Sequence, residues 1–175
     1  MGADEGGLRV LYRRPELCMA ETRGMILMLQ LGAMRVEWLP AMHAAHIETA
    51  ERYGGPRPFI ALCRLDPRYP IDVGFDANLP ELKRAFERML PYFRACAVIV
   101  DIDGFLGAAL YRGLRFIGML ARREPPMDAF RNAGEAVRWI EPYALDCTVG
   151  PFDASHYLRS LRALEALLGE ERGPR

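Results

Sequence analysis

Two carboxylates, Asp101 and Asp103, stand two residues apart at the end of an apolar run in the sequence VIVDIDGF. In a phosphatase, one carboxylate of such a pair attacks phosphorus and the other transfers protons, while Mg²⁺ balances the charge. In the alternative interpretation, Asp101 ends a strand and Asp103-Gly104 turns the chain into a helix. This structural interpretation is favoured over the phosphatase, because no lysine follows to bind phosphate and no second acidic pair follows a strand.

The same stretch resembles the first motif of the haloacid dehalogenase-like phosphatases, in which the glycine is followed by threonine. Here Phe105 follows Gly104, and the motif lies past the middle of the chain. A Mg²⁺-dependent phosphatase that uses Asp101 and Asp103 is therefore kept as the alternative function.

The histidines and cysteines give weaker candidates for chemistry. His43 and His46 stand one helical turn apart, so both can face one metal ion, with Glu48 as a further ligand. The sequence suggests no third ligand elsewhere, and no metal is expected. Cys63 and Cys96 lie within apolar strand candidates, where a thiol is buried and unreactive. We expect no catalytic residues and no cofactor.

The elements that position the two aspartates are a strand and a long helix. Ala95–Val100 is an apolar run without alternation, which predicts a strand buried on both faces. A helix of about five turns is predicted to follow Gly104. It contains Gly107, Gly113 and Gly118, each of which costs about 1 kcal/mol relative to alanine, so we expect a close approach to the sheet.

The remaining periodicities predict an α/β fold with a single central mixed sheet of five or six strands and helices packed on it. Antiparallel pairing is expected at the start of the sheet. Residues 1–150 are assigned to this domain, and residues 151–175 to a C-terminal amphipathic helix with a polar tail. The other predicted strands are Leu8–Arg13, Leu17–Glu21, Met25–Leu31, Phe59–Leu65 and Met127–Phe130, and the other predicted helices are Arg35–Tyr53, one capped by Asn78, Asn132–Ile140 and one from Asp153 or Ser155.

Composition and charge set broad limits on function. The 175 residues are 51% hydrophobic and carry no net charge, which is typical of one globular domain without affinity for nucleic acid or an anionic membrane. The four dispersed cysteines fit free thiols in a reducing compartment. The start of the sequence shows no signal-peptide pattern, and no apolar segment is long enough to span a bilayer. A cytoplasmic location is expected.

Between Arg35 and Ile140 the order of elements resembles the bacterial STAS and SpoIIAA-like group, which includes STAS/CRAL-TRIO-like lipid-binding relatives. The local marker is FRNAGEAVRWI at Phe130–Ile140, which is similar to the closing strand and the Glu-Ala-x-x-Trp-Leu helix of the group. Anti-sigma antagonists carry Asp-Ser-Ser-Gly-Leu, with a phosphorylatable serine, after the central strand. The comparable stretch Asp101–Phe105 has no hydroxyl group.

The resemblance implies a non-enzymatic signalling or scaffolding module that binds a partner protein. A homodimer and an apolar-ligand (lipid) binding protein are left open. In the resembled group, the turn after the central strand and the start of the next helix form the regulatory face, which here comprises Asp101, Asp103, Gly104, Phe105, Arg112 and Arg115. Physically, Asp103 offsets the positive helix N-terminus and Phe105 adds an aromatic anchor. In the competing interpretation Phe105 is buried and Asp103 only caps the helix.

Overall fold

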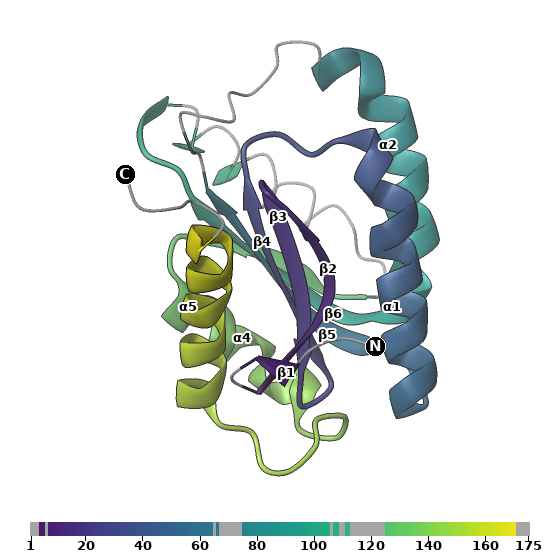
Figure 1. Ribbon diagram of the computed structural model, residues 1–175, viewed down its shortest axis with the longest axis vertical. Coiled ribbons are helices and arrows are strands. Elements are labelled where there is room, and N and C mark those ends of the chain that lie inside the picture. The colour runs from purple at the N-terminus through teal and green to yellow at the C-terminus, as the bar shows by residue number, and fades with distance from the viewer. Residues whose placement is uncertain are drawn as a thin grey trace.

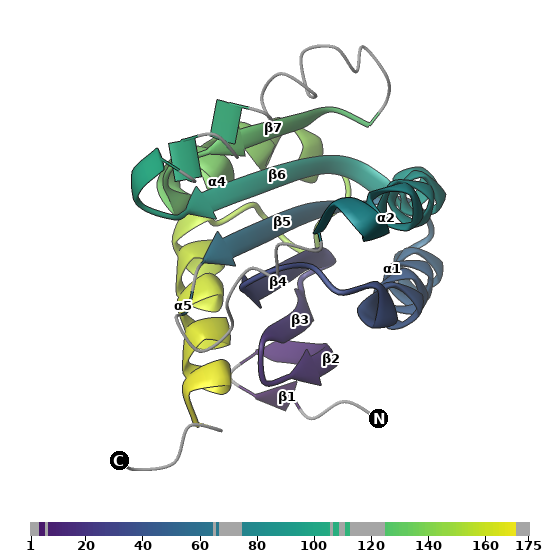
Figure 2. The same ribbon diagram turned by 90° about the horizontal axis from the view of Figure 1, so that it is seen from above.

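In the residues that the structure describes, the protein is a three-layer α/β structure, with one sheet between two layers of helices (Figures 1 and 2). This computed structural model describes residues 4–5, 7–64, 66, 75–105, 107–108, 111–112 and 125–170. Helices α1 (Leu39–Tyr53) and α2 (Phe75–Met89) cover one face of the sheet. Helices α4 (Ala133–Ala144) and α5 (Ala154–Glu170) cover the other face.

The strands of the sheet lie side by side in the order of the sequence. Strands β1 to β4 pair antiparallel, and β4 to β7 pair parallel. The predicted α/β fold with one mixed sheet is confirmed: six strands have four or more residues, and the two-residue β1 adds a short edge. The strands are β1 (Asp4–Glu5), β2 (Leu8–Arg14), β3 (Leu17–Thr22), β4 (Met25–Leu31), β5 (Arg57–Arg64), β6 (Phe93–Asp101) and β7 (Met127–Phe130).

The central strands are apolar throughout because both of their faces are buried. In β4, Leu27 and Leu29 belong to the core under α4 and α5, whereas Ile26 and Met28 belong to the core under α1 and α2. Side chains alternate between the two faces of a strand, so a strand between two helical layers needs no polar positions. The prediction of a doubly buried strand after Arg94 is confirmed in the same way.

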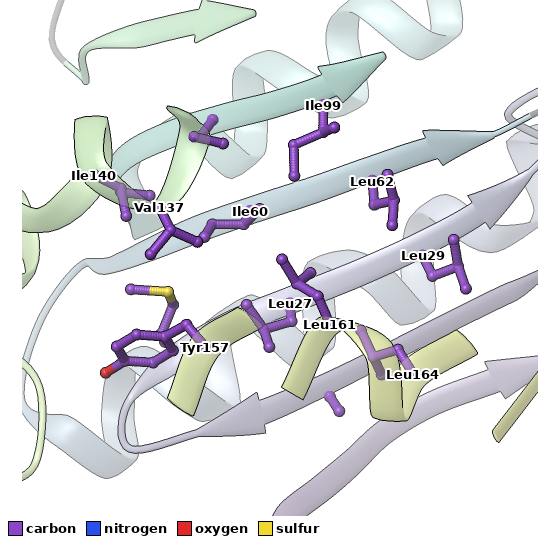
Figure 3. Packing of buried hydrophobic residues seen from close by; sticks show 14 of the residues in the cluster. Leu27, Leu29, Ile60, Leu62, Ile99, Val137, Ile140, Tyr157, Leu161 and Leu164 are labelled. Atoms are coloured by element: carbon purple, nitrogen blue, oxygen red, sulfur yellow. The ribbon is translucent and has the colours of Figure 1, made fainter. Parts of the chain in front are cut away.

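Helices α4 and α5 share one hydrophobic core with the sheet (Figure 3). α4 packs on β5, β6 and β7, and α5 packs on β3 and β4. Helix α5 therefore contributes to the main core of the protein. The fully buried side chains of this layer include Leu27, Ile60, Ile99, Val137, Ile140, Tyr157 and Leu164.

Helix α4 begins where the sequence predicted and ends later. The side chain of Asn132 accepts a hydrogen bond from the Glu135 N–H at 2.9 Å, which is the predicted N-cap. The prediction that Pro142 ends the helix near Ile140 is wrong, because the helix continues to Ala144. Ala144 is fully buried, so its packing offsets the backbone hydrogen bond that proline removes.

Two other helices also differ from the sequence prediction at their N-termini. The segment predicted as one helix from Arg35 starts as a 3₁₀ turn over Val36–Trp38 and becomes α-helical at Leu39. α2 starts at Phe75 instead of after Asn78, so Pro80 lies inside the helix.

Within the described part of the chain, no helix combines the length and hydropathy needed to cross a membrane.

Candidate functional site

The predicted site lies where the parallel strands β5 and β6 end next to each other. Arg64 and Asp101 are register partners at these ends. The Arg64 guanidinium contacts Asp101 Oδ2 through Nε at 2.8 Å and Nη2 at 2.6 Å, and Nη2 also contacts Glu165 Oε1 at 3.1 Å. One arginine therefore joins β5, β6 and α5 at this edge of the sheet.

The turn after β6 brings its polar groups to the surface while Ile102 anchors it. Ile102 is buried, and its carbonyl oxygen accepts a hydrogen bond from Arg131 Nη1 at 3.3 Å. Asp103 and Gly104 are exposed, and Gly104 has a φ of +74°, in the left-handed region that favours glycine. The backbone of the turn is thus fixed from inside, and its carboxylates face solvent.

Phe105 projects into solvent from the start of the following helix. Its side chain is 91% exposed, well above the other large exposed apolar residues, Leu145 at 58% and Val149 at 56%. The interpretation that Phe105 is buried is therefore wrong. Arg112 is helical and exposed, and Arg115 lies outside the described residues.

We call Asp101, Asp103, Gly104, Phe105 and Arg112 the docking surface. It combines an aromatic ring and a guanidinium, which are enriched at the centres of protein interfaces, with two carboxylates, which are more typical of the polar rim. Its role in binding stays a prediction at this point.

Gly107 allows the backbone of the helix to lie in close contact with the backbone of the turn. A Cβ atom at this position would lie 1.8 Å from the Ile102 carbonyl oxygen and 2.6 Å from the Ile102 carbonyl carbon. Only glycine fits this contact without a backbone shift. At Gly107 the helix approaches the turn and not the sheet, so the predicted close approach to the sheet stays a prediction, and Gly113 and Gly118 lie outside the described residues.

The two aspartates have different surroundings. Asp101 ends β6 with its Oδ2 held by Arg64, so the carboxylate that would attack a phosphoryl group already has a cationic partner. Asp103 is exposed on the turn. In the described ranges, no group of three or more His, Cys, Asp or Glu side chains is placed to hold a metal ion.

The His-x-x-His pair lies in a packed aromatic environment. His46 is 1% exposed, with its ring edge-on to Phe59 and Phe93 at centroid distances of 4.9 and 4.7 Å. Neither of its two ring nitrogens has a hydrogen-bond partner among the residues that the structure describes. Burial, together with the charge of His43, lowers the pKa of His46 to about 3. His46 therefore serves as a neutral core residue.

The two strand cysteines are protonated at neutral pH. Burial raises the pKa of Cys63 to about 11 and that of Cys96 to about 12. A thiol is a weak nucleophile in this form, so neither residue is suited to covalent catalysis.

A depression on the surface of α2 offers little to an apolar ligand. Its volume is about 530 Å³, and it is lined by charged side chains from successive turns of the helix: Glu81, Arg84, Glu87 and Arg88. Apolar ligands bind in concave sites lined mainly by hydrophobic side chains. The lipid-binding alternative gains no support from this feature.

Sequence reasoning missed a buried polar cluster at the opposite end of the sheet. Glu21 is 4% exposed and accepts hydrogen bonds from Arg9 Nε at 3.1 Å, the Gly24 N–H at 2.8 Å and the Tyr53 hydroxyl at 2.8 Å. The buried Arg57 donates from Nε to the Gly24 carbonyl at 2.8 Å. The sequence feature that could have predicted this cluster is Glu21 in a mainly apolar strand, because a glutamate is rarely buried without partners.

Comparisons with known proteins give one structural likeness. No protein-family model and no curated protein matches the sequence. Among solved structures, the chain is similar to an uncharacterized protein of the DUF3478 family with a SpoIIAA-like fold from Shewanella loihica PV-4. The identity is 16% and the TM-score 0.43, over 79% of this chain and 98% of the other.

Proposed function

We propose that this chain is a non-enzymatic cytoplasmic module that binds a partner protein through the docking surface. The observation that carries the proposal is the 91% exposure of Phe105 between acidic and basic side chains. An exposed aromatic ring loses contact with water when a partner covers it, which contributes about 2 kcal/mol or more to binding. The cytoplasmic assignment rests on four free cysteines.

The contacts of the residues around Phe105 favour a docking surface that is already formed before a partner binds. Ile102 is buried, Gly107 allows the helix to approach it, and Arg64 ties the end of β6 to its neighbours. A rigid support lowers the conformational entropy lost on binding. These features favour recognition by a surface that is already in its bound conformation.

The first test replaces the aromatic anchor. We expect Phe105→p-benzoylphenylalanine to form a photo-crosslink with a protein in native cytosolic extract, and excess unlabelled wild-type chain to suppress that product. When the unlabelled Phe105→Ala chain is the competitor, at least about ten times the wild-type concentration should be needed to suppress the product. This factor corresponds to roughly 1.4 kcal/mol of binding free energy. Asp103→Ser, which can still cap a helix, should weaken competition similarly. Gel densitometry of the crosslinked product provides the measurement.

A matched control uses the opposite end of the molecule. Val149 is also apolar and exposed, and its N–H bonds the Arg23 carbonyl in the β3–β4 turn, far from the docking surface. The crosslinker at position 149 should give no competed product, and Val149→Ala should compete like wild type. Equal competition by Phe105→Ala and wild type would move the interface away from Phe105.

The non-enzymatic assignment has its own assay. With a generic phosphomonoester and Mg²⁺, we expect no turnover above buffer, because Arg64 holds the Asp101 carboxylate. Turnover that disappears in Asp101→Asn would replace the binding proposal by the phosphatase alternative. Release of inorganic phosphate is the measured quantity.

A further inference from the structure

We infer that acid opens the protein at one face, by releasing the layer of α1 and α2 from the sheet while the core under α4 and α5 stays packed. The side chain responsible is His46, which α1 holds against the sheet. The inference is independent of the docking surface, whose Asp101 is tied to α5 through Arg64.

His46 occupies a position that accepts only an uncharged ring. It is 1% exposed and lies edge-on to Phe59 of β5 and Phe93 of β6, which both belong to the core under α1 and α2. Neither ring nitrogen has a hydrogen-bond partner in the described part of the chain. An imidazolium carries two N–H donors, so protonation in place would bury a charge and leave both donors without acceptors.

The charged groups around His46 do not offset a proton on its ring. His43, one turn earlier on α1, disfavours that proton, because two imidazolium charges repel each other. Arg57 at the start of β5 is a cation that stacks on Tyr53, two helical turns from His46. The basic side chains described on α1, α2 and β6 are exposed. The carboxylates described on these three elements are also exposed: Glu48, Glu51, Glu81, Glu87 and Asp101.

A proton therefore stabilises any state in which His46 reaches water. Burial lowers the pKa of His46 to about 3, whereas a hydrated histidine has a pKa of 6.5. Between these two values the open state binds a proton that the closed state does not bind. The population of the open state should consequently rise about 30-fold between pH 7.5 and pH 5.

The opening is confined to one face because the two helical layers have separate cores. One hydrophobic cluster lies under α1 and α2, and the other lies under α4 and α5 on the opposite face of the sheet (Figure 2). α4 and α5 approach the backbone of the sheet at more positions than α1 does. Local openings involve the less tightly packed parts of a structure. Acid thus acts on the layer that is easier to release.

Two native thiols report on the two cores separately. Cys96 lies in the core under α1 and α2, as the register partner of Phe59, and Cys18 lies in the core under α4 and α5. Both side chains are buried. The full-length wild-type chain is treated with a pyridyl disulfide, which also reacts with thiols in acid, at pH 7.5 and pH 5. Peptide mass spectrometry follows each thiol, and each rate is divided by that of the urea-unfolded chain at the same pH.

We expect the relative rate of Cys96 to rise about 30-fold between pH 7.5 and pH 5, and to exceed that of Cys18 at least about tenfold at pH 5. His46→Leu should abolish the rise at Cys96, because leucine gains no proton in the open state. His43→Gln should retain it. Equal relative rates of the two thiols in wild type at pH 5 would overturn the inference, since they indicate global unfolding, and this comparison needs no variant. A rise at Cys96 that persists in His46→Leu would overturn it as well.

Discussion

Replacing His46 by leucine is expected to remove most of the acid sensitivity that this residue gives to the fold. The native pKa of His46 is about 3, whereas an unfolded histidine has a pKa of 6.5. Between these values the unfolded chain binds a proton that the native chain does not. The contribution of neutral His46 to the free energy of unfolding is therefore fully present above pH 6.5. It is lost as the pH drops towards 3, by about 5 kcal/mol in total.

The measurement is the free energy of unfolding in urea at pH 7.5 and pH 5. His46 alone should account for about 2 kcal/mol of the loss between these two values, and His46→Leu should lose that much less than wild type. At pH 7.5 the variant should match or exceed wild-type stability, because both ring nitrogens of His46 are buried without a hydrogen-bond partner in the described part of the chain.

The control for this experiment lies one turn earlier on the same helix. His43 is only partly buried, and its ring lies against Tyr92 at a centroid distance of 5.5 Å. His43→Gln should keep most of the wild-type dependence on pH. If His46→Leu and wild type lost stability equally between pH 7.5 and pH 5, His46 would not be the source of the acid sensitivity.

Gly107→Ala is expected to destabilise the protein by about 3 kcal/mol, although alanine is the better helix former. The added Cβ would lie 1.8 Å from the Ile102 carbonyl oxygen, and this contact involves backbone on both sides. A rotamer change cannot relieve it, so the helix must move away from the turn that carries Asp103 and Phe105. The variant should therefore also weaken crosslink competition.

Gly134→Ala provides the matched control for that substitution. Gly134 lies in the first turn of α4, and an added Cβ would meet only Asn132 Oδ1 at 3.5 Å, an ordinary contact distance. There the change should stabilise the protein by up to about 1 kcal/mol. Urea unfolding measures both variants, and equal effects at the two positions would show that the contact at Gly107 is relaxed in solution.

Sequence alone determined the fold class and located the strands β2 to β7 to within two residues at each end. Strands buried on both faces must be apolar without interruption, and this pattern located Met25–Leu31 and Ala95–Val100 before any contact was known. Local chemistry was also sufficient for the cap at Asn132, because a cap depends on neighbouring backbone N–H groups. The turn at Asp101–Gly104 was identified on the same local basis.

Only the tertiary structure decided how the site is held and which side chains it exposes. Arg64 and Glu165 stand 101 positions apart, and no local sequence pattern predicts their contact. Arg64 nevertheless contacts both Glu165 on α5 and Asp101 at the end of β6, and so joins these two elements. Whether Phe105 is buried or exposed was open, because an apolar residue in a first helical turn can face either way. Pro142 shows the same limit: the burial of Ala144, a tertiary effect, extends the helix past a residue that local propensity would have made its end.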